Sequence, residues 1–343
     1  MSLVHDASVG SPSTGDAPAV ITGVAGFIGS HLADALLASG QPVLGVDRFD
    51  DYYGRELKEA NLANATSHAN FDLLEADIRT VAHTLFHGVD TVYHLAGRPG
   101  VQDSWTVEFE RYCLDNIAAT QAVFDAALAS GVRRVVVASS SSVYGNGASA
   151  TGERLVAPTS PYGVSKAATE QLASVYRARG LDVVCLRYFT VYGPRQRPDM
   201  AMARLFAATV PGGAPFRRRG SGDQRREFTY VGDVVKATIA AGTVAAAANH
   251  TFDIGGGSSV SLNEVIDHIG AITGRAVPCV DVGAAPGDPA VTEADCDPAT
   301  EILEWKPVVA VDEGLARQGA ALPLVLDMGA DSSGPSSVSL LAG

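Results

Sequence analysis

Short apolar segments alternate with amphipathic ones along the first half of the chain. Runs rich in Val and Ile, without regular polar alternation, predict buried strands at residues 19–22, 42–46, 91–95, 134–138 and 182–186. The stretches between them predict helices, such as 30–39, which ends before Gly40. Such strands suit a sheet that is buried on both faces, and strand–helix–strand repetition makes that sheet parallel. The pattern therefore predicts an α/β fold with a Rossmann-type doubly wound parallel sheet.

The regular alternation of predicted strands and helices ends after Tyr192, where Pro and Gly recur at short intervals. A helix is predicted at 201–209, a strand near 252–255 and another helix at 261–270. We expect a nucleotide-binding domain and a smaller C-terminal substrate-binding lobe, with a crevice between them beyond the carboxyl ends of the strands. The predicted boundaries are a flexible tail at 1–18, the sheet domain at 19–190 plus 229–258, the lobe at 191–228 plus 259–323, and a second flexible tail at 328–343.

Composition narrows the class of protein. Hydrophobic residues make up 46% of the 343 residues, which is ample for a core, while 25 Lys and Arg against 38 Asp and Glu give a net charge of -13. This balance excludes a general binder of nucleic acid or anionic membranes. Membrane helices need roughly 18 apolar residues, and no run approaches that length. The first 47 residues lack Lys and Arg, and the four cysteines lack metal-ligand spacing, so we expect a cytoplasmic protein with reduced thiols and no metal.

Three glycines, Gly23, Gly26 and Gly29, lie between the first predicted strand and the first predicted helix. This spacing lets the backbone approach a pyrophosphate at the helix N-terminus. Asp47 ends the next strand, 18 residues after Gly29, where a carboxylate accepts both ribose hydroxyls of NAD. Asp47 would repel a 2′-phosphate, which favours NAD, although the neighbouring Arg48 keeps NADP open.

A second set of polar residues marks the opposite end of the predicted crevice. Tyr162 and Lys166 are spaced i and i+4, so they share one helix face. A lysine cation beside the phenol is expected to lower the pKa of the tyrosine and make it a general base. Residues 139–142 are four serines that follow a buried strand, and hydroxyls there are costly to desolvate unless they bind something.

Four motifs together resemble those of a known family. In their order along the chain they are the glycine loop, His94-Leu95-Ala96-Gly97, the serine run before Val143-Tyr144-Gly145, and Tyr162-x-x-x-Lys166. They resemble the extended short-chain dehydrogenase/reductase superfamily, in its NAD-dependent sugar-nucleotide epimerase/dehydratase branch. The resemblance covers residues 19 to about 323. It implies a bound NAD that takes a hydride from a sugar carbon, with Tyr162 as base and Lys166 on the nicotinamide ribose.

The resemblance also assigns the remaining residues. Gly97 stands where the family usually has Ala, a replacement we expect to be neutral. Asp77 and Ile78 either hold the adenine or form an exposed acidic turn. The expected cofactor contacts are Gly23, Gly26, Phe27, Ile28, Gly29, Asp47, Arg48, Asp77, Ile78, Leu95, Ala96, Asn116, Tyr162 and Lys166. The expected catalytic residues are Tyr162, Lys166, Ser140, Ser141 and Ser142. No metal ligands are expected.

The serine run restricts the sugar chemistry. Relatives that remove water across C5 and C6 carry Asp and Glu at the positions of Ser141 and Ser142, and relatives that decarboxylate UDP-glucuronate typically carry Glu at position 142. Serine hydroxyls cannot supply that acid and base near neutral pH. What remains is 4-epimerisation: oxidation at C4 to a 4-keto sugar, rotation, and hydride return to the opposite face.

The segments 47–58 and 189–201 resemble those of UDP-glucuronate 4-epimerases, so we expect interconversion of UDP-glucuronate and UDP-galacturonate. Arg197 would meet the sugar carboxylate, and nine arginines and two aspartates between residues 187 and 226 predict one small cationic pocket. The expected substrate contacts are Ser140, Ser141, Thr190, Arg197, Arg219, Arg226 and Asp288. Arg219 replaces a frequent aromatic residue, and Gln102 replaces an arginine common in glucuronate epimerases.

Three alternatives stay open. Two are enzymes, a UDP-glucose 4-epimerase and a UDP-glucuronate decarboxylase. The third is a catalytically silent NAD-binding sensor, which would have a broken Tyr–Lys pair. The predicted helix 103–130 has apolar residues on its faces, including Phe109, Tyr112 and Phe124. These either form the homodimer interface that relatives use or pack against the sheet.

Overall fold

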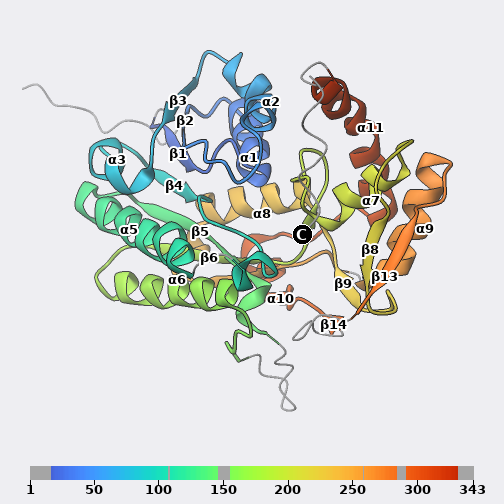
Figure 1. The fold of residues 1–343 in the computed structure, drawn as a ribbon. Coiled ribbons are helices and arrows are strands. Elements are labelled where there is room, and N and C mark those ends of the chain that lie inside the picture. Colours follow the sequence, from blue (N-terminus) through green and yellow to red (C-terminus); the bar gives the residue numbers. More distant parts are fainter. Residues whose placement is uncertain (1–16, 107–108, 146–154, 258, 284–290, 331–343) are drawn as a thin grey trace, which may run out of the picture.

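A seven-stranded parallel sheet forms the centre of the molecule (Figure 1), in the order β11-β6-β5-β4-β1-β2-β3. The computed structural model describes residues 17–106, 109–145, 155–257, 259–283 and 291–330. The strands of this sheet are β1 (Ala19–Thr22), β2 (Val43–Asp47), β3 (Phe71–Glu75), β4 (Thr91–His94), β5 (Arg134–Ser140), β6 (Val183–Tyr188) and β11 (Thr251–Ile254). The order reverses between β1 and β4, which places a ligand crevice at their carboxyl ends. The predicted fold class is confirmed.

Two helical layers cover the sheet, and each encloses its own apolar core. One face carries α1 (Phe27–Ala38), α2 (Arg55–Thr66), α8 (Val231–Thr243) and α10 (Asp297–Leu303). The other face carries α3 (Ile78–Leu85), α5 (Ala119–Ser130) and α6 (Pro161–Ala178). Because both faces are covered, the strands need no polar alternation, as the sequence pattern indicated. Gly40 follows α1 with a φ of 86°, which fits its predicted place after the helix.

The C-terminal lobe lies at one side of the sheet (Figure 1) and has a third apolar core. Its helices are α7 (Ala201–Thr209), α9 (Leu262–Thr273) and α11 (Val311–Ala330). Its short strands pair as β8 (Phe216–Arg219) with β13 (Cys279–Val282), and as β9 (Arg225–Glu227) with β12 (Ser259–Ser261) and β14 (Val291–Thr292). A further pair, β7 (Val191–Tyr192) with β10 (Thr229–Tyr230), adjoins them. Both predicted helices of this part are present.

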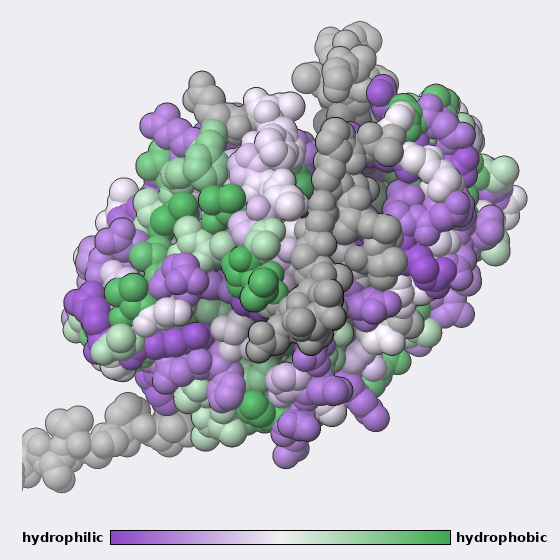
Figure 2. Space-filling model, turned by 90° about the horizontal axis from the view of Figure 1, so that it is seen from below, coloured by the Kyte–Doolittle hydropathy of each residue, from purple (hydrophilic) through white to green (hydrophobic). Residues whose placement is uncertain are grey.

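The segment predicted as one helix over 103–130 is divided. The structure has a 3₁₀ turn η1 (Asp103–Trp105), α4 (Phe109–Tyr112), a π-helical segment η2 (Cys113–Ala118) and then α5. Within it Tyr112 and Phe124 are buried, whereas Phe109 and Leu114 are 41% and 42% exposed. In Figure 2, apolar side chains gather on the part of the lower face where α5 and α6 lie in Figure 1. Packing against the sheet therefore explains part of the pattern, and the homodimer stays a prediction.

The ends of the chain are described in part. Helix α11 continues to Ala330, three residues into the predicted C-terminal tail, while residues 1–16 and 331–343 lie outside the described residues. The division into two domains stays a prediction. Within the described part of the chain, no helix is long and apolar enough to cross a membrane, and no group of acidic, His or Cys side chains could hold a metal ion.

Arg134, at the start of β5, joins the sheet to the C-terminal end of α8. It is 2% exposed and donates from Nε to Asp182 Oδ2 at 2.6 Å. Its Nη atoms donate to the carbonyl oxygens of Ala241, Val244 and Ala245 at 3.1, 2.6 and 3.3 Å. A single guanidinium thus satisfies carbonyl groups that the end of a helix leaves without donors.

We expect Arg134→Met to lower the free energy of unfolding by about 3 kcal/mol, because it leaves Asp182 and the α8 carbonyls without their donor. Urea denaturation followed by circular dichroism measures the loss. The control is Arg317→Met, since Arg317 pairs with Glu313 one turn away on the same helix and its side chain is 49% exposed, and exposed pairs contribute at most about 1 kcal/mol. Equal losses in the two variants would contradict the special role of Arg134.

Candidate active site

A cavity of about 440 Å³ opens at the carboxyl ends of the parallel strands. Most of the expected site residues line it, from both halves of the chain: Gly23, Gly26, Phe27, Ile28, Gly29, Asp47, Arg48, Asp77, Ile78, Leu95, Ala96, Ser140, Ser141, Ser142, Tyr162, Lys166, Thr190 and Arg197. Arg219 and Arg226 are not among the lining residues, and Asp288 lies outside the described residues. The strand ends therefore converge as the sequence predicted.

The glycine loop has the backbone that a diphosphate site requires. Gly23 adopts a φ of 72°, and a Cβ at Gly29 would lie 2.3 Å from the carbonyl oxygen of Gly23. No side chain caps the N-terminus of α1 at Gly26, so the amide groups of the first turn remain available to an anion. This loop fits the diphosphate of a dinucleotide.

Asp47 and Arg48 settle the choice between the two dinucleotides that the sequence left open. The Asp47 carboxylate is held at the end of β2 because Ala25 N donates to Oδ2 at 3.1 Å and Phe49 N donates to Oδ1 at 2.8 Å. Arg48 pairs with Asp115 at 2.7 Å and with Asp50 at 2.9 Å. Since the Arg48 guanidinium is already committed to two carboxylates, and Asp47 repels a 2′-phosphate, the residues present fit NAD.

Asp77 caps a helix and also lines the cavity. Its Oδ1 accepts from Arg79 N at 3.0 Å and so caps α3, and its carboxylate pairs with the Arg79 guanidinium. The hydrogen bond from Arg79 lowers the pKa of Asp77. Asp77 and Ile78 both line the cavity, so the adenine contact stays a prediction for a residue that also has a structural role.

Tyr162 and Lys166 lie on α6, which Ser160 caps by accepting from Gly163 N at 3.0 Å. Burial lowers the pKa of Lys166 to about 8, and its Nζ donates to the carbonyl oxygen of Ala138 at 2.8 Å. Burial raises the pKa of Tyr162, against opposing effects of its hydrogen bond with Ser140 and of the positive charge of Arg197. In the protein alone the groups that oppose burial are Ser140 and Arg197, so the lowering of the Tyr162 pKa by Lys166 together with a bound nicotinamide stays a prediction.

All four serines of the run line the cavity, but some of their hydroxyls already have partners within the fold. Ser139 Oγ donates to Glu170 Oε1 at 2.5 Å, deep in the fold. Ser140 Oγ donates to Ser142 Oγ at 3.1 Å and also accepts from Ser142 N. The Ser139 hydroxyl is thus satisfied by Glu170 within the fold, and ligand binding by Ser140, Ser141 and Ser142 stays a prediction.

Asn116 holds the loop after β4 rather than lining the cavity. From the π-helical segment, its Oδ1 accepts from Arg98 N at 2.6 Å, while its Nδ2 donates to the Arg98 carbonyl at 3.0 Å and to Ser165 Oγ at 2.8 Å. A Cβ on Gly97 would lie 2.9 Å from Asn116 Oδ1. The expectation that glycine is neutral at this position stays a prediction, since the distance shows only that alanine at position 97 of this chain would displace the Asn116 carboxamide.

The arginine-rich segment does not form one cationic pocket. All nine of its arginines are described, and of these only Arg197 lines the cavity. Others pair within the fold, for example Arg187 with Glu170 and Arg225 with Glu264. Arg219 donates to Gln102 Oε1 at 3.1 Å, and neither residue is among those that line the cavity. Local charge along the sequence overestimated the charge that faces the cavity because most of these side chains already have acidic partners.

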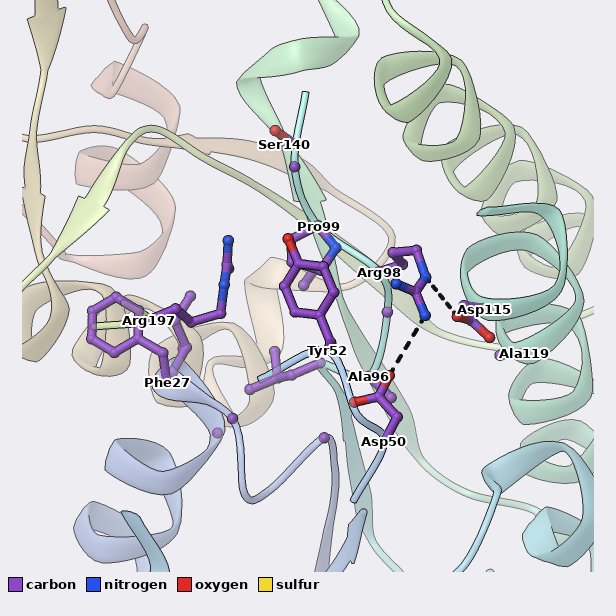
Figure 3. Close-up of a pocket in the computed structure, with 18 of the residues that line it drawn as sticks. Phe27, Asp50, Tyr52, Ala96, Arg98, Pro99, Asp115, Ala119, Ser140 and Arg197 are labelled. Atoms are coloured by element: carbon purple, nitrogen blue, oxygen red, sulfur yellow. Dashed lines mark hydrogen bonds and ion pairs between the residues drawn. The ribbon is translucent and has the colours of Figure 1, made fainter. Parts of the chain in front are cut away.

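Sequence reasoning missed the ion pairs that surround the cofactor end of the cavity. Arg98 is 8% exposed and pairs with Asp115 at 3.1 Å and with Asp50 at 3.7 Å (Figure 3). Lys58 is 4% exposed and pairs with Asp50 at 2.7 Å. Arg98 lies far from Asp50 in the sequence and on another loop, so no local pattern could have indicated that pair.

A dinucleotide loop, an acidic residue after the second strand and a Tyr–Lys pair in one cavity define a short-chain dehydrogenase/reductase. Comparisons with known proteins narrow this class. The family model described as "NAD dependent epimerase/dehydratase family" matches residues 19–255. The chain belongs to this family, and its cofactor is NAD.

Three relatives are especially similar. An uncharacterized UDP-glucose epimerase of Bacillus subtilis, YtcB, is 38% identical over 88% of this chain and 97% of its own length. A UDP-glucuronate 4-epimerase of Thermodesulfobacterium geofontis is 35% identical over 87% of this chain and 94% of its own. The crystal structure of UDP-glucuronic acid 4-epimerase from Bacillus cereus, in complex with UDP-glucuronic acid and NAD, has a TM-score of 0.86 at 36% identity, and covers 90% of this chain and 99% of that one.

We expect Gly97→Ala to lower kcat at least about tenfold, because a new methyl group against Asn116 shifts the loop that carries Ala96 and Arg98. Steady-state kinetics and the NAD content of the purified protein measure the effect. The double variant Gly97→Ala/Asn116→Ala serves as the control, since it removes the clash together with the carboxamide. Full activity in Gly97→Ala would show that Asn116 yields without consequence.

Proposed function

We propose that the protein is a UDP-sugar 4-epimerase that interconverts UDP-glucuronate and UDP-galacturonate. The observation that carries the proposal is the presence of Tyr162, Lys166 and Arg197 in one cavity, beside a loop that fits NAD. Arg197 lies close enough to Tyr162 for its charge to lower the pKa of the phenol. A base and an anion-binding group are thus available to the same small ligand. The named relatives, which include epimerases for both sugars, support the reaction class.

In the proposed reaction Tyr162 accepts the proton from the C4 hydroxyl of the sugar, while its bond with Ser140 holds the phenol oxygen in place. Lys166 lies one helical turn further on, where its charge favours the phenolate over the phenol. When bound, NAD supplies the reversible oxidation at C4. Ser140, Ser141 and Thr190 line the cavity and offer hydroxyl groups to the sugar as it turns.

The position of Arg197 in the cavity supports a sugar substrate with a C6 carboxylate. Oxidation at C4 makes the C6 carboxylate part of a β-keto acid, which loses carbon dioxide when its C5–C6 bond aligns with the carbonyl π system. An arginine that grips the carboxylate in a poor orientation protects this intermediate. The Arg197 side chain is 15% exposed, so the contact would form in a largely desolvated site, where such pairs are strong.

The alternatives make different demands on the same residues. A UDP-glucuronate decarboxylase would use an acid where Ser142 stands, and a UDP-glucose 4-epimerase would not need Arg197. A catalytically silent sensor would lack the Tyr–Lys pair, whereas Tyr162 and Lys166 both line the cavity. The arrangement therefore favours the uronate epimerase.

Incubation of the purified protein with UDP-glucuronate or with UDP-glucose, without added NAD, tests the proposal. NMR is expected to show UDP-galacturonate from the first substrate, because the cavity pairs a base with an anion-binding group. Inversion of UDP-glucose alone would favour the UDP-glucose 4-epimerase. A UDP-pentose as the main product would favour the decarboxylase, and no reaction with either sugar would favour the sensor.

We expect Arg197→Ala to increase the share of UDP-pentose among the products of UDP-glucuronate at least about tenfold, because the carboxylate is then free to align with the C4 ketone. NMR of the product mixture gives this share directly. Arg195→Ala is a matched control, since Arg195 pairs with Asp34 at 2.8 Å and does not line the cavity. A variant that binds UDP-glucuronate normally and releases no extra pentose would refute the protective role of Arg197.

A further inference from the structure

The ring of Tyr52 lies between two guanidinium groups inside the cavity (Figure 3). The Cζ atom of Arg98 is 5.3 Å from the ring centroid and that of Arg197 is 5.5 Å from it. Tyr52 comes from the turn between β2 and α2, Arg98 follows β4, and Arg197 precedes α7. Three separate segments therefore meet at this one ring.

The two arginines differ in how their charges are balanced. Arg98 is buried and pairs with Asp115, whose side chain is only 9% exposed, so its charge is committed to the fold. Among the carboxylates of the described residues, Arg197 pairs only with that of Asp199, at 2.9 Å. The Asp199 side chain is 42% exposed. A pair with an exposed partner is weakly held and exchanges readily for another anion. Arg197 is thus the guanidinium that a ligand can engage.

Tyr52 is itself fixed in place. Its Oη donates to Asp103 Oδ2 at 2.8 Å, and its ring meets that of Tyr53 edge to face at a centroid distance of 6.3 Å. Gly100 has a φ of 101°, and a Cβ there would lie 3.0 Å from the Asp103 carboxylate and 3.3 Å from Tyr52 Oη. The loop after β4 therefore leaves room for this bond.

We propose that Tyr52 is a specificity-determining positioning residue, whose ring holds the Arg197 guanidinium toward the sugar and thereby favours substrates with a C6 carboxylate. This inference rests on the proposed function. The π face of the ring attracts each cation, and the ring separates two like charges that would otherwise repel. Without the ring, the Asp199 carboxylate two residues away is the one ion-pair partner that Arg197 keeps in the described part of the chain, so the direction of its guanidinium is less constrained.

Calorimetric binding of UDP-glucuronate, UDP-glucose and UDP to the NAD-loaded protein tests this role. Tyr52→Leu, which removes the ring, is expected to weaken UDP-glucuronate binding about tenfold and UDP-glucose or UDP binding by less than about twofold. Tyr52→Phe keeps the ring and loses only the bond to Asp103, so it should weaken UDP-glucuronate binding by about threefold rather than tenfold. KM for UDP-glucuronate should rise more than kcat falls, because the substrate is held less well.

The possible outcomes separate the inference from the function on which it rests. A wild-type protein that binds UDP-glucose as tightly as UDP-glucuronate overturns the proposed function, and the role of Tyr52 with it. A wild-type preference that is unchanged in Tyr52→Leu overturns only the role of Tyr52. Equal weakening for all three ligands, or loss of bound NAD, would show that the ring merely supports the fold and would also overturn it.

A second variant covers the case in which Tyr52→Leu does not fold. Asp103→Ala removes the acceptor of the Tyr52 hydroxyl and leaves the ring in the chain. It should shift the ratio of UDP-glucuronate to UDP-glucose affinity in the same direction, by about threefold. An unchanged ratio in a folded Asp103→Ala protein would contradict the proposal.

Discussion

Charges at the carboxyl edge of the sheet cannot be buried without partners, and this constraint organises the cofactor end of the cavity. Lys58, Arg48 and Arg98 approach the edge from three segments, and Asp50 and Asp115 compensate them. Removing one member of such a network would leave a buried charge, which is costly. The loops after β2 and β4 are therefore tied to the π-helical segment, and they form a rigid wall of the site.

Cofactor choice follows from this network rather than from Asp47 alone. An arginine beside the acidic residue looks like a partner for a 2′-phosphate when it is judged from sequence. In the folded chain that arginine, Arg48, forms ion pairs with Asp115 and Asp50. The same wall presents Arg98 to one face of Tyr52, so its influence extends to the sugar end of the cavity.

Sequence patterns predicted what local geometry decides. Several features depend only on neighbouring residues, and the structure has them as predicted. They are the predicted strands of the sheet, the glycine loop with its left-handed Gly23, and the placement of Tyr162 and Lys166 on one helix. Other features depend on distances between remote segments of the chain. They are the ion pairs of Arg98, the contact between Gly97 and Asn116, and the positions of the arginines of segment 187–226, most of which lie outside the cavity lining. The pKa of Tyr162 belongs to the second group, because it depends on burial and on Ser140 and Arg197, which come from other segments of the chain.

The close approach of Gly97 to Asn116 links the substitution histories of two positions. Since a Cβ at position 97 would lie 2.9 Å from the carboxamide, alanine at this position of the chain requires the Asn116 side chain to move. A chain that acquired the methyl group first would pass through a form with a displaced loop. The order of the two changes therefore matters, and residues 97 and 116 are best exchanged together when segments of related enzymes are combined.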